Sequence, residues 1–149
     1  MFLCPLPYPR CLLAALLLPG PAPGPPAAFF ATYRYTAYTV YDHTTDAPPT
    51  RVPGVGGTLA LRPDGTYDKR LSLLMGDSGP RLFAQHGRFA TQGDSIRFLF
   101  TDAKGPDVQR GTYRYDARTR RLTIAIAGYP PGNRGVYELV AGAPPARRK

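Results

Sequence analysis

A short acidic segment offers the first residues that could do chemistry. Asp42-His43-Thr44-Thr45-Asp46 brings two carboxylates and one imidazole within five residues. Oxygen and nitrogen ligands of this kind can hold a divalent metal ion. The segment contains no further acidic residue, so water would have to fill most coordination positions. A loop with local capping hydrogen bonds is the stronger interpretation, and we expect neither a metal site nor a cofactor.

A second candidate is a serine between glycines. Gly76-Asp77-Ser78-Gly79-Pro80 is similar to the nucleophile motif of chymotrypsin-like proteases, where backbone amides stabilise an oxyanion and a histidine activates the serine. This copy lacks the second glycine before proline, and the chain is too short for the two barrels that carry that triad. Gly93-Asp94-Ser95 repeats the tripeptide where a hairpin turn is expected. Because these residue types form turns for local backbone reasons, we predict a turn here.

The elements that would position any site are short segments of alternating apolar residues. Leu59 and Leu61 precede Pro63-Asp64-Gly65, and Ile96 and Phe98 follow a Gly-Asp turn. Period-2 alternation bounded by glycine, proline and aspartate is typical of half-buried antiparallel strands. We predict an all-β fold, an eight-stranded antiparallel up-and-down barrel, with a β-sandwich as the alternative. The predicted strands are Phe29 to Tyr41, Thr58 to Leu61, Tyr67 to Leu74, Leu82 to Ala90, Ser95 to Thr101, Val108 to Tyr115, Arg121 to Ala127 and Val136 to Val140.

These segments suggest a family. Gly57-Thr58-Leu59-Ala60-Leu61 followed by Asp64-Gly65-Thr66-Tyr67 resembles the strand-turn-strand of small bacterial lipocalin-like (calycin-type) domains, and Gly87-Arg88-Phe89 looks like the next hairpin. The resemblance covers roughly residues 29–142 and implies a barrel with an internal cavity for a small apolar ligand. The chain has no tryptophan, so the G-x-W motif of typical lipocalins is absent. Tyr33 or Tyr35 would take its place, and a relative without this motif can have a filled interior.

Carboxylates for acid–base catalysis are scarce. Glu138 is the only glutamate, and the aspartates lie mostly in predicted turns. A barrel enzyme would need a polar residue inside the barrel, and His86 and Arg97 are the first to examine. Arg97 alternates with Ile96 and Phe98 and should therefore point outward. We predict that the protein is not an enzyme.

The N-terminus reads as an export signal. Arg10 precedes a run of apolar residues from Cys11 to Leu18, which suits a secretory signal peptide and is shorter than the ~20 residues of a membrane-spanning helix. We predict a signal peptide at 1–28 with cleavage after Ala28, a barrel domain at 29–142 and a disordered basic tail at 143–149. A disordered N-terminal tail is the alternative. The prediction implies a secreted or periplasmic protein without a transmembrane segment.

The formal net charge of +9 favours anionic partners. Basic residues are densest from Arg110 to Arg134, with tyrosines among them. Alternation places Arg110 and Arg114 on one face of their strand and Tyr113 and Tyr115 on the other, as an outer surface and an inner lining. Nucleic acid is not an expected partner of an exported protein. A solvated surface is the simpler interpretation of the charge.

Two functions are compatible with these features. The first is an exported, non-catalytic, lipocalin-like protein that binds a small apolar or amphipathic ligand in the barrel. The second is an envelope interaction module with a filled barrel, whose arginine surface contacts anionic polymers or a protein partner. Aromatic residues supply apolar area and tyrosine hydroxyls orient polar groups. The predicted ligand-binding residues are Tyr35, Phe89, Phe98, Phe100, Tyr113, Tyr115 and Tyr137.

Overall fold

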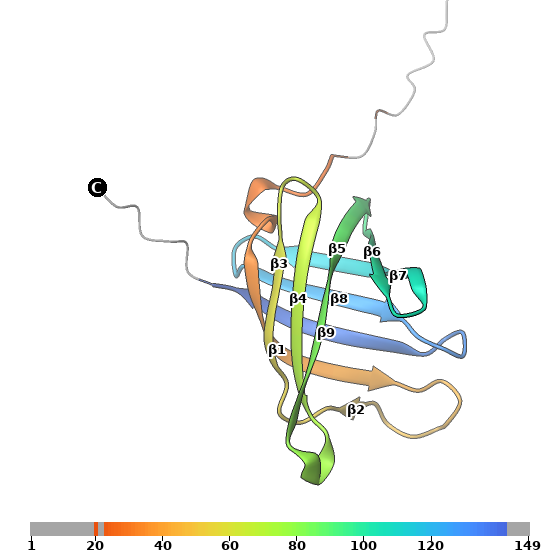
Figure 1. The fold of residues 1–149 in the computed structure, drawn as a ribbon. Helices are drawn as coiled ribbons and strands as arrows, with labels where there is room; N and C mark the ends of the chain where they lie inside the picture. Colours follow the sequence, from red (N-terminus) through yellow and green to blue (C-terminus); the bar gives the residue numbers. More distant parts are fainter. Residues whose placement is uncertain (1–19, 21–22, 143–149) are drawn as a thin grey trace, which may run out of the picture.

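The structure, a computed structural model, describes residue 20 and residues 23–142 (Figure 1). The predicted tail at 143–149 and most of the predicted signal peptide lie outside the described residues. The elements in chain order are the 3-10 helix η1 (Ala27–Phe29), β1 (Thr32–Tyr41), β2 (Thr50–Arg51), β3 (Gly56–Leu61), β4 (Thr66–Leu74), η2 (Gly76–Ser78), β5 (Pro80–Gln92), β6 (Ser95–Asp102), β7 (Gly105–Asp116), β8 (Arg121–Ala127) and β9 (Arg134–Ala141).

The strands form a closed barrel. Each strand from β3 to β9 pairs antiparallel with the next, and β1 pairs with both β3 and β9, so the sheet closes on itself. The two-residue strand β2 pairs antiparallel with Thr39 and Val40, near the C-terminal end of β1. The predicted eight-stranded antiparallel barrel is therefore confirmed, and the sandwich alternative is wrong. Closure pairs the edges that an open sheet would leave exposed.

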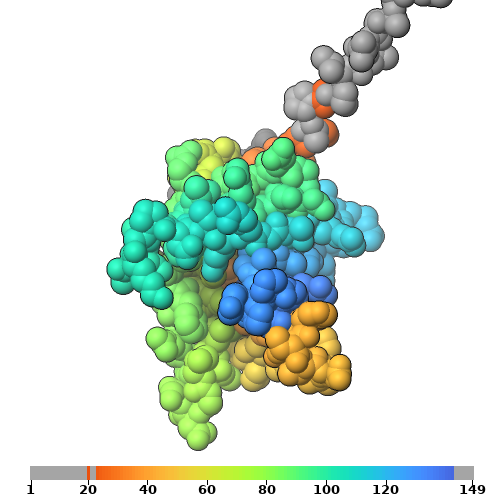
Figure 2. Space-filling view, turned by 90° about the vertical axis from the view of Figure 1, so that its right-hand side faces the viewer, coloured from red at the N-terminus to blue at the C-terminus, as the bar shows by residue number. Residues whose placement is uncertain are grey.

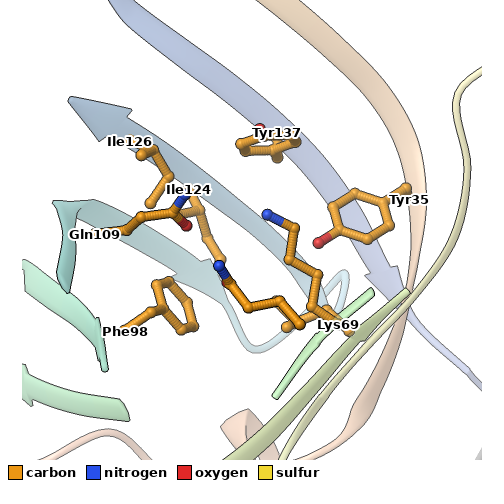
Figure 3. A pocket seen from close by; sticks show the side chains of 9 residues that line it. Tyr35, Lys69, Phe98, Gln109, Ile124, Ile126 and Tyr137 are labelled. Carbon is orange, nitrogen blue, oxygen red and sulfur yellow. The ribbon is translucent and has the colours of Figure 1, made fainter. Parts of the chain in front are cut away.

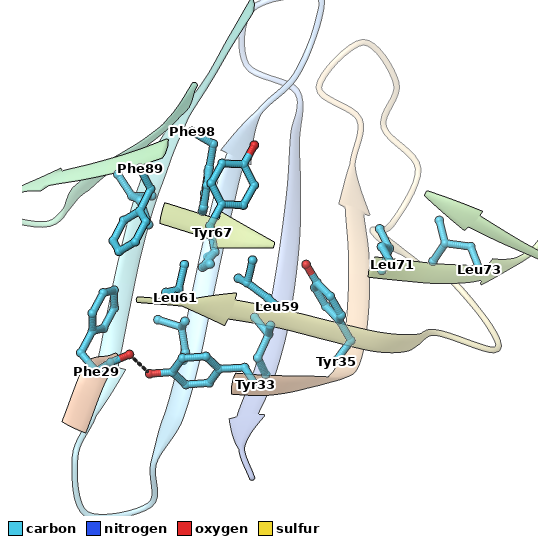
Figure 4. Packing of buried hydrophobic residues seen from close by; sticks show 14 residues of the cluster. Phe29, Tyr33, Tyr35, Leu59, Leu61, Tyr67, Leu71, Leu73, Phe89 and Phe98 are labelled. Carbon is cyan, nitrogen blue, oxygen red and sulfur yellow. Dashed lines mark hydrogen bonds between the residues drawn. The ribbon is translucent and has the colours of Figure 1, made fainter. Parts of the chain in front are cut away.

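Strand alternation places one face of every strand inside the barrel. On β1 the inward side chains Tyr33 and Tyr35 are buried, while Arg34 between them is exposed. Tyr67 opposes Leu61 and Leu122 opposes Leu139 across neighbouring strands. These residues belong to one hydrophobic core, and Figure 4 shows Tyr33, Leu61 and Tyr67 within it. The described residues hold no buried polar or charged residue outside the tyrosines.

One end of the barrel is closed by the segment before β1. The Phe29 side chain is fully buried and contacts four other aromatic rings: Phe30, Phe89, Tyr113 and Tyr115. Its carbonyl accepts a hydrogen bond from the Tyr33 hydroxyl (Figure 4). We call this end, which also carries the β3–β4, β5–β6 and β7–β8 turns, the closed end.

The opposite end is the open end and carries a second set of connections. They are the β1–β2 loop and the β4–β5, β6–β7 and β8–β9 hairpins. Figure 2 looks onto this end and shows a recess between them. The β4–β5 hairpin projects beyond the other strands (Figure 1). Around its tip lie the exposed apolar residues Leu74, Met75, Leu82 and Phe83.

Two details of the prediction were wrong. The first strand begins at Thr32 rather than at Phe29, because Phe29 ends a 3-10 helix whose aromatic side chain turns inward over the barrel end. The segment between Tyr41 and Thr58, where no strand was predicted, contains the short strand β2, whose neighbour Val52 donates its amide to the Tyr38 carbonyl. The part of the chain that the structure describes contains no candidate membrane-spanning helix.

Candidate functional site

A hollow lies inside the barrel on the side of its open end (Figure 3). Its volume is about 20 Å³, which is room for about one water molecule. Beyond it toward the closed end the interior is filled by the aromatic core. The hollow is lined by Tyr35, Leu59, Lys69, Gln85, Phe98, Gln109, Ile124, Ile126 and Tyr137.

Lys69 brings a positive charge into this hollow. On β4 it shares the inward face with Tyr67 and Leu71, and it lies opposite Leu59 of β3 and Gln85 of β5. Its Nζ lies 5.7 Å from the centre of the Tyr137 ring, within the range of a cation–π contact. Desolvation inside the barrel lowers the pKa of the Lys69 ammonium from its ordinary value.

Three tyrosines form one wall of the hollow and its surroundings. The Tyr38 and Tyr137 rings are stacked, with centroids 4.4 Å apart, and Tyr35 meets Tyr137 edge-on at 5.7 Å. Burial raises the pKa of the Tyr35 and Tyr137 hydroxyls well above the usual value. Both hydroxyls therefore stay protonated at neutral pH, and each can donate a hydrogen bond.

Two amides complete the polar part of the lining. The Tyr67 hydroxyl donates a 3.0 Å hydrogen bond to Oε1 of Gln85, so the Gln85 NH₂ group is left to face other partners. Gln109 of β7 lies opposite Phe98 of β6. One cation, two amides and two hydroxyls thus meet Leu59, Ile124, Ile126 and Phe98 in the same space.

The predicted ligand-binding residues fall into separate groups in the structure. Tyr35, Phe98 and Tyr137 line the hollow. Phe89, Tyr113 and Tyr115 surround Phe29 at the closed end, and the Tyr115 hydroxyl donates to the Ala28 carbonyl. Phe100 is half-buried, opposite Gly87, and does not line the hollow. Alternation predicts the inward face correctly but does not tell the two ends of a barrel apart.

The polar lining residues Lys69, Gln85 and Gln109 were not predicted from the sequence. The signal was present, because Lys69 shares its strand face with Tyr67 and Leu71, and Gln109 shares its face with Gly111 and Tyr113. Apolar residues define a strand face in a sequence pattern, so polar residues in register with them are easily overlooked. A lysine on the inward face of a strand points to a functional site more strongly than an apolar residue there does, because charged residues are rarely buried.

The other sequence candidates have local structural roles. Asp42 accepts hydrogen bonds from the backbone and hydroxyl of Thr44, and the described residues contain no group of three or more histidine, cysteine or acidic side chains suited to a metal ion. Gly76–Ser78 forms a 3-10 turn between β4 and β5. His86 and Arg97 are both exposed on the outside of the barrel.

The fold and the hollow define a class: a small closed antiparallel barrel with one sealed end and one open end that carries polar groups inside. No family model matches the chain. No curated protein matches it either.

Proposed function

We propose that the protein is an exported, non-catalytic, lipocalin-like protein that binds a small amphipathic molecule in the open end of its barrel. The observation that supports this is the contrast between the two ends. Phe29 and its aromatic neighbours fill the closed end, whereas Lys69, Gln85 and Gln109 project into the interior at the other. Removing polar groups from water costs about 1–3 kcal/mol each unless they find partners. Lys69, Gln85 and Gln109 are half-buried on the inward face, and polar side chains at such positions favour a binding site over a purely apolar core.

The small volume of the hollow sets a condition on binding. A molecule larger than water enters only if lining side chains move. Lys69 and Gln109 are long and unbranched, so rotation about their side-chain bonds can open space without shifting the backbone. The aromatic cluster at the closed end has no comparable freedom because its rings interlock. Binding is accordingly expected at the open end.

Mass spectrometry of the protein expressed as the full chain tests this proposal. The native mass is compared with the denatured mass, before and after incubation with fatty acids, fatty alcohols and other amphiphiles. A mass excess that disappears on denaturation is the expected result. A bare native mass that none of these compounds changes would contradict the proposal.

A pair of variants locates the bound molecule. Ile126→Phe adds bulk inside the hollow, whereas Ala125→Phe adds the same kind of bulk on the neighbouring outward position of β8. The mass excess should be lost in the first variant and kept in the second. Loss in both, or in neither, would place the ligand elsewhere.

The arginine surface supports a second candidate function. Arg97 of β6 lies directly opposite Arg110 of β7, and both are exposed. Like charges in directly opposite positions destabilise a sheet, so an anionic polymer bound across the pair would relieve their repulsion. Adhesion to a polyanion such as heparin should weaken as salt rises and should fall in Arg97→Gln/Arg110→Gln. Arg34→Gln is the matched control, since β1 lies on the opposite side of the barrel.

A further inference from the structure

The interior of the open end holds a positive charge that no carboxylate of the described residues neutralises. Within the described part of the chain, the one side-chain ion pair joins Arg70 to Asp68 at 3.5 Å. Both of these residues belong to the outward face of β4, whereas Lys69 between them points inward. The strand therefore pairs its outer cation and leaves its inner one unpaired.

The acidic residue nearest to the hollow by strand register does not change this balance. Asp107 precedes Gln109 by two residues on β7, which puts it on the same face but farther toward the open end. It is exposed, and its carboxylate accepts the Val108 amide at 2.7 Å. It forms no ion pair with Lys69.

Lys69 is half-buried, and partial removal of an ammonium from water without a counter-charge is unfavourable. The lowered pKa of Lys69 reflects that cost. A ligand that supplied a negative charge would offset this unfavourable desolvation free energy and would form a charge-assisted hydrogen bond with Lys69.

We propose that the ligand is a monocarboxylate amphiphile, bound with its carboxylate inward on Lys69 and its apolar part directed toward the open end. This inference rests on the function proposed above. The Gln109 amide and the Tyr35 hydroxyl line the same space and supply donors to the second carboxylate oxygen (Figure 3).

The geometry favours a carboxylate over a phosphate. The described lining contributes one ammonium and no guanidinium, while phosphate recognition usually employs the planar fork of arginine or several cations. The volume of about 20 Å³ accommodates an oxygen or a small planar group more easily than a tetrahedral one. A single compact charge matches a single compact anion.

The geometry also sets the direction of binding. Tyr67 and Phe98 pack against each other at 4.9 Å on the closed side of Lys69, so a tail has no space there. On the open side, the inward face of β4 continues from Lys69 to Leu71 and Leu73, and Phe83 of β5 lies opposite Leu71. Leu71 and Leu73 are buried, so a hydrocarbon tail directed this way would pack against apolar side chains.

Calorimetric titration with decanoate and with decanol tests the inference, since the two probes share a tail and differ in charge. The wild type should bind decanoate at least about tenfold more tightly than decanol, in keeping with a charge-assisted hydrogen bond. Lys69→Met should bring the ratio close to one. Arg70→Met removes the same charge from the outer face and should leave the ratio unchanged.

The ratio of the two affinities separates the outcomes. Equal affinities in the wild type would overturn the carboxylate inference while leaving the proposed function intact, whereas no binding of either probe would contradict both. A decanoate preference that survives in Lys69→Met would overturn the role of Lys69. Lys69→Gln serves as the second variant if Lys69→Met does not fold, and the same ratio close to one is expected.

Discussion

The hydroxyl of Tyr33 donates a 2.6 Å hydrogen bond to the backbone carbonyl of Phe29, and both side chains are completely buried. This contact fixes the segment before β1 over the closed end of the barrel. It satisfies a carbonyl that would otherwise be cut off from water by the aromatic cluster around it.

Tyr33→Phe should therefore lower the free energy of unfolding by about 1–3 kcal/mol, the usual cost of leaving a buried acceptor unpaired. Chemical denaturation monitored by circular dichroism measures the loss. Tyr115→Phe is the control, because the Tyr115 hydroxyl bonds to the Ala28 carbonyl in an exposed position where water can replace it. Equal losses in the two variants would argue against a special role for the buried bond.

Gly57 should tolerate no side chain. Its φ of +94° lies in the region that favours glycine, and a Cβ there would collide with the Arg70 carbonyl of the paired strand. Gly57→Ala should cost about 1–3 kcal/mol or more from strain alone. Gly56→Ala is a matched control one residue away, since a Cβ at that position meets no atom within 4 Å. Thermal unfolding of the two variants compares them, and similar melting temperatures would contradict the prediction.

Alkaline pH should unfold the protein through its buried tyrosines. Burial raises the pKa of Tyr33, Tyr35, Tyr67 and Tyr137 above the ordinary 10.0. For an acid with a raised folded pKa, the unfolded state loses its proton first. Stability is thus intact below about pH 10 and declines as the pH rises above it.

Tyrosinate absorbance followed alongside circular dichroism checks this, because the chain contains no tryptophan to interfere. The exposed Tyr129 should ionise while the fold persists, and the buried tyrosines should ionise together with unfolding. Ionisation of every tyrosine in a single early step, with the fold retained, would be inconsistent with the buried positions.

Lys69→Met should make the unliganded protein more stable, because it replaces a desolvated cation by an apolar side chain of similar length. The sign of the pH dependence follows from the lowered folded pKa of Lys69. Between the lowered pKa of Lys69 in the folded state and the ordinary 10.5, the unfolded state binds more protons than the folded state. The free energy of unfolding of the wild type therefore increases relative to that of the variant as the pH rises. The difference in unfolding free energy should be largest at neutral pH and narrow on the alkaline side. A variant less stable than the wild type at neutral pH would show that Lys69 stabilises the fold.

Much of the fold was predictable from the sequence because a β-strand has a side-chain period of two and its turns have distinctive residues. Ile96, Phe98 and their neighbours identified a strand face without any knowledge of its partner. The inward turn of Phe29 was not predictable in the same way, since it depends on aromatic residues of β5 and β7 that are far away in the sequence. No local pattern records such a contact.

The candidate site likewise contains residues that could be predicted from the sequence and a location that could not. Tyr35, Phe98 and Tyr137 were predicted because they are aromatic and inward-facing, and Phe89, Tyr113 and Tyr115 met the same criteria although they belong to the closed end. Which end a residue occupies depends on the turn nearest to it, because successive turns of this barrel alternate between the two ends. Side-chain alternation alone does not carry that information. Lys69, in contrast, could have been predicted from alternation alone.

The pairing of β1 with β9 has a consequence for how the chain matures during synthesis. Tyr38 on β1 pairs with Tyr137 on β9. During synthesis, β1 therefore leaves the ribosome long before its partner strand β9 has been made. Contacts of such long sequence separation form slowly, and until they form both strands present open edges to other nascent chains. Pairing of β9 with β1 thus closes the barrel last. A chain truncated before Arg134 should remain an open sheet and become a substrate for chaperones and proteases.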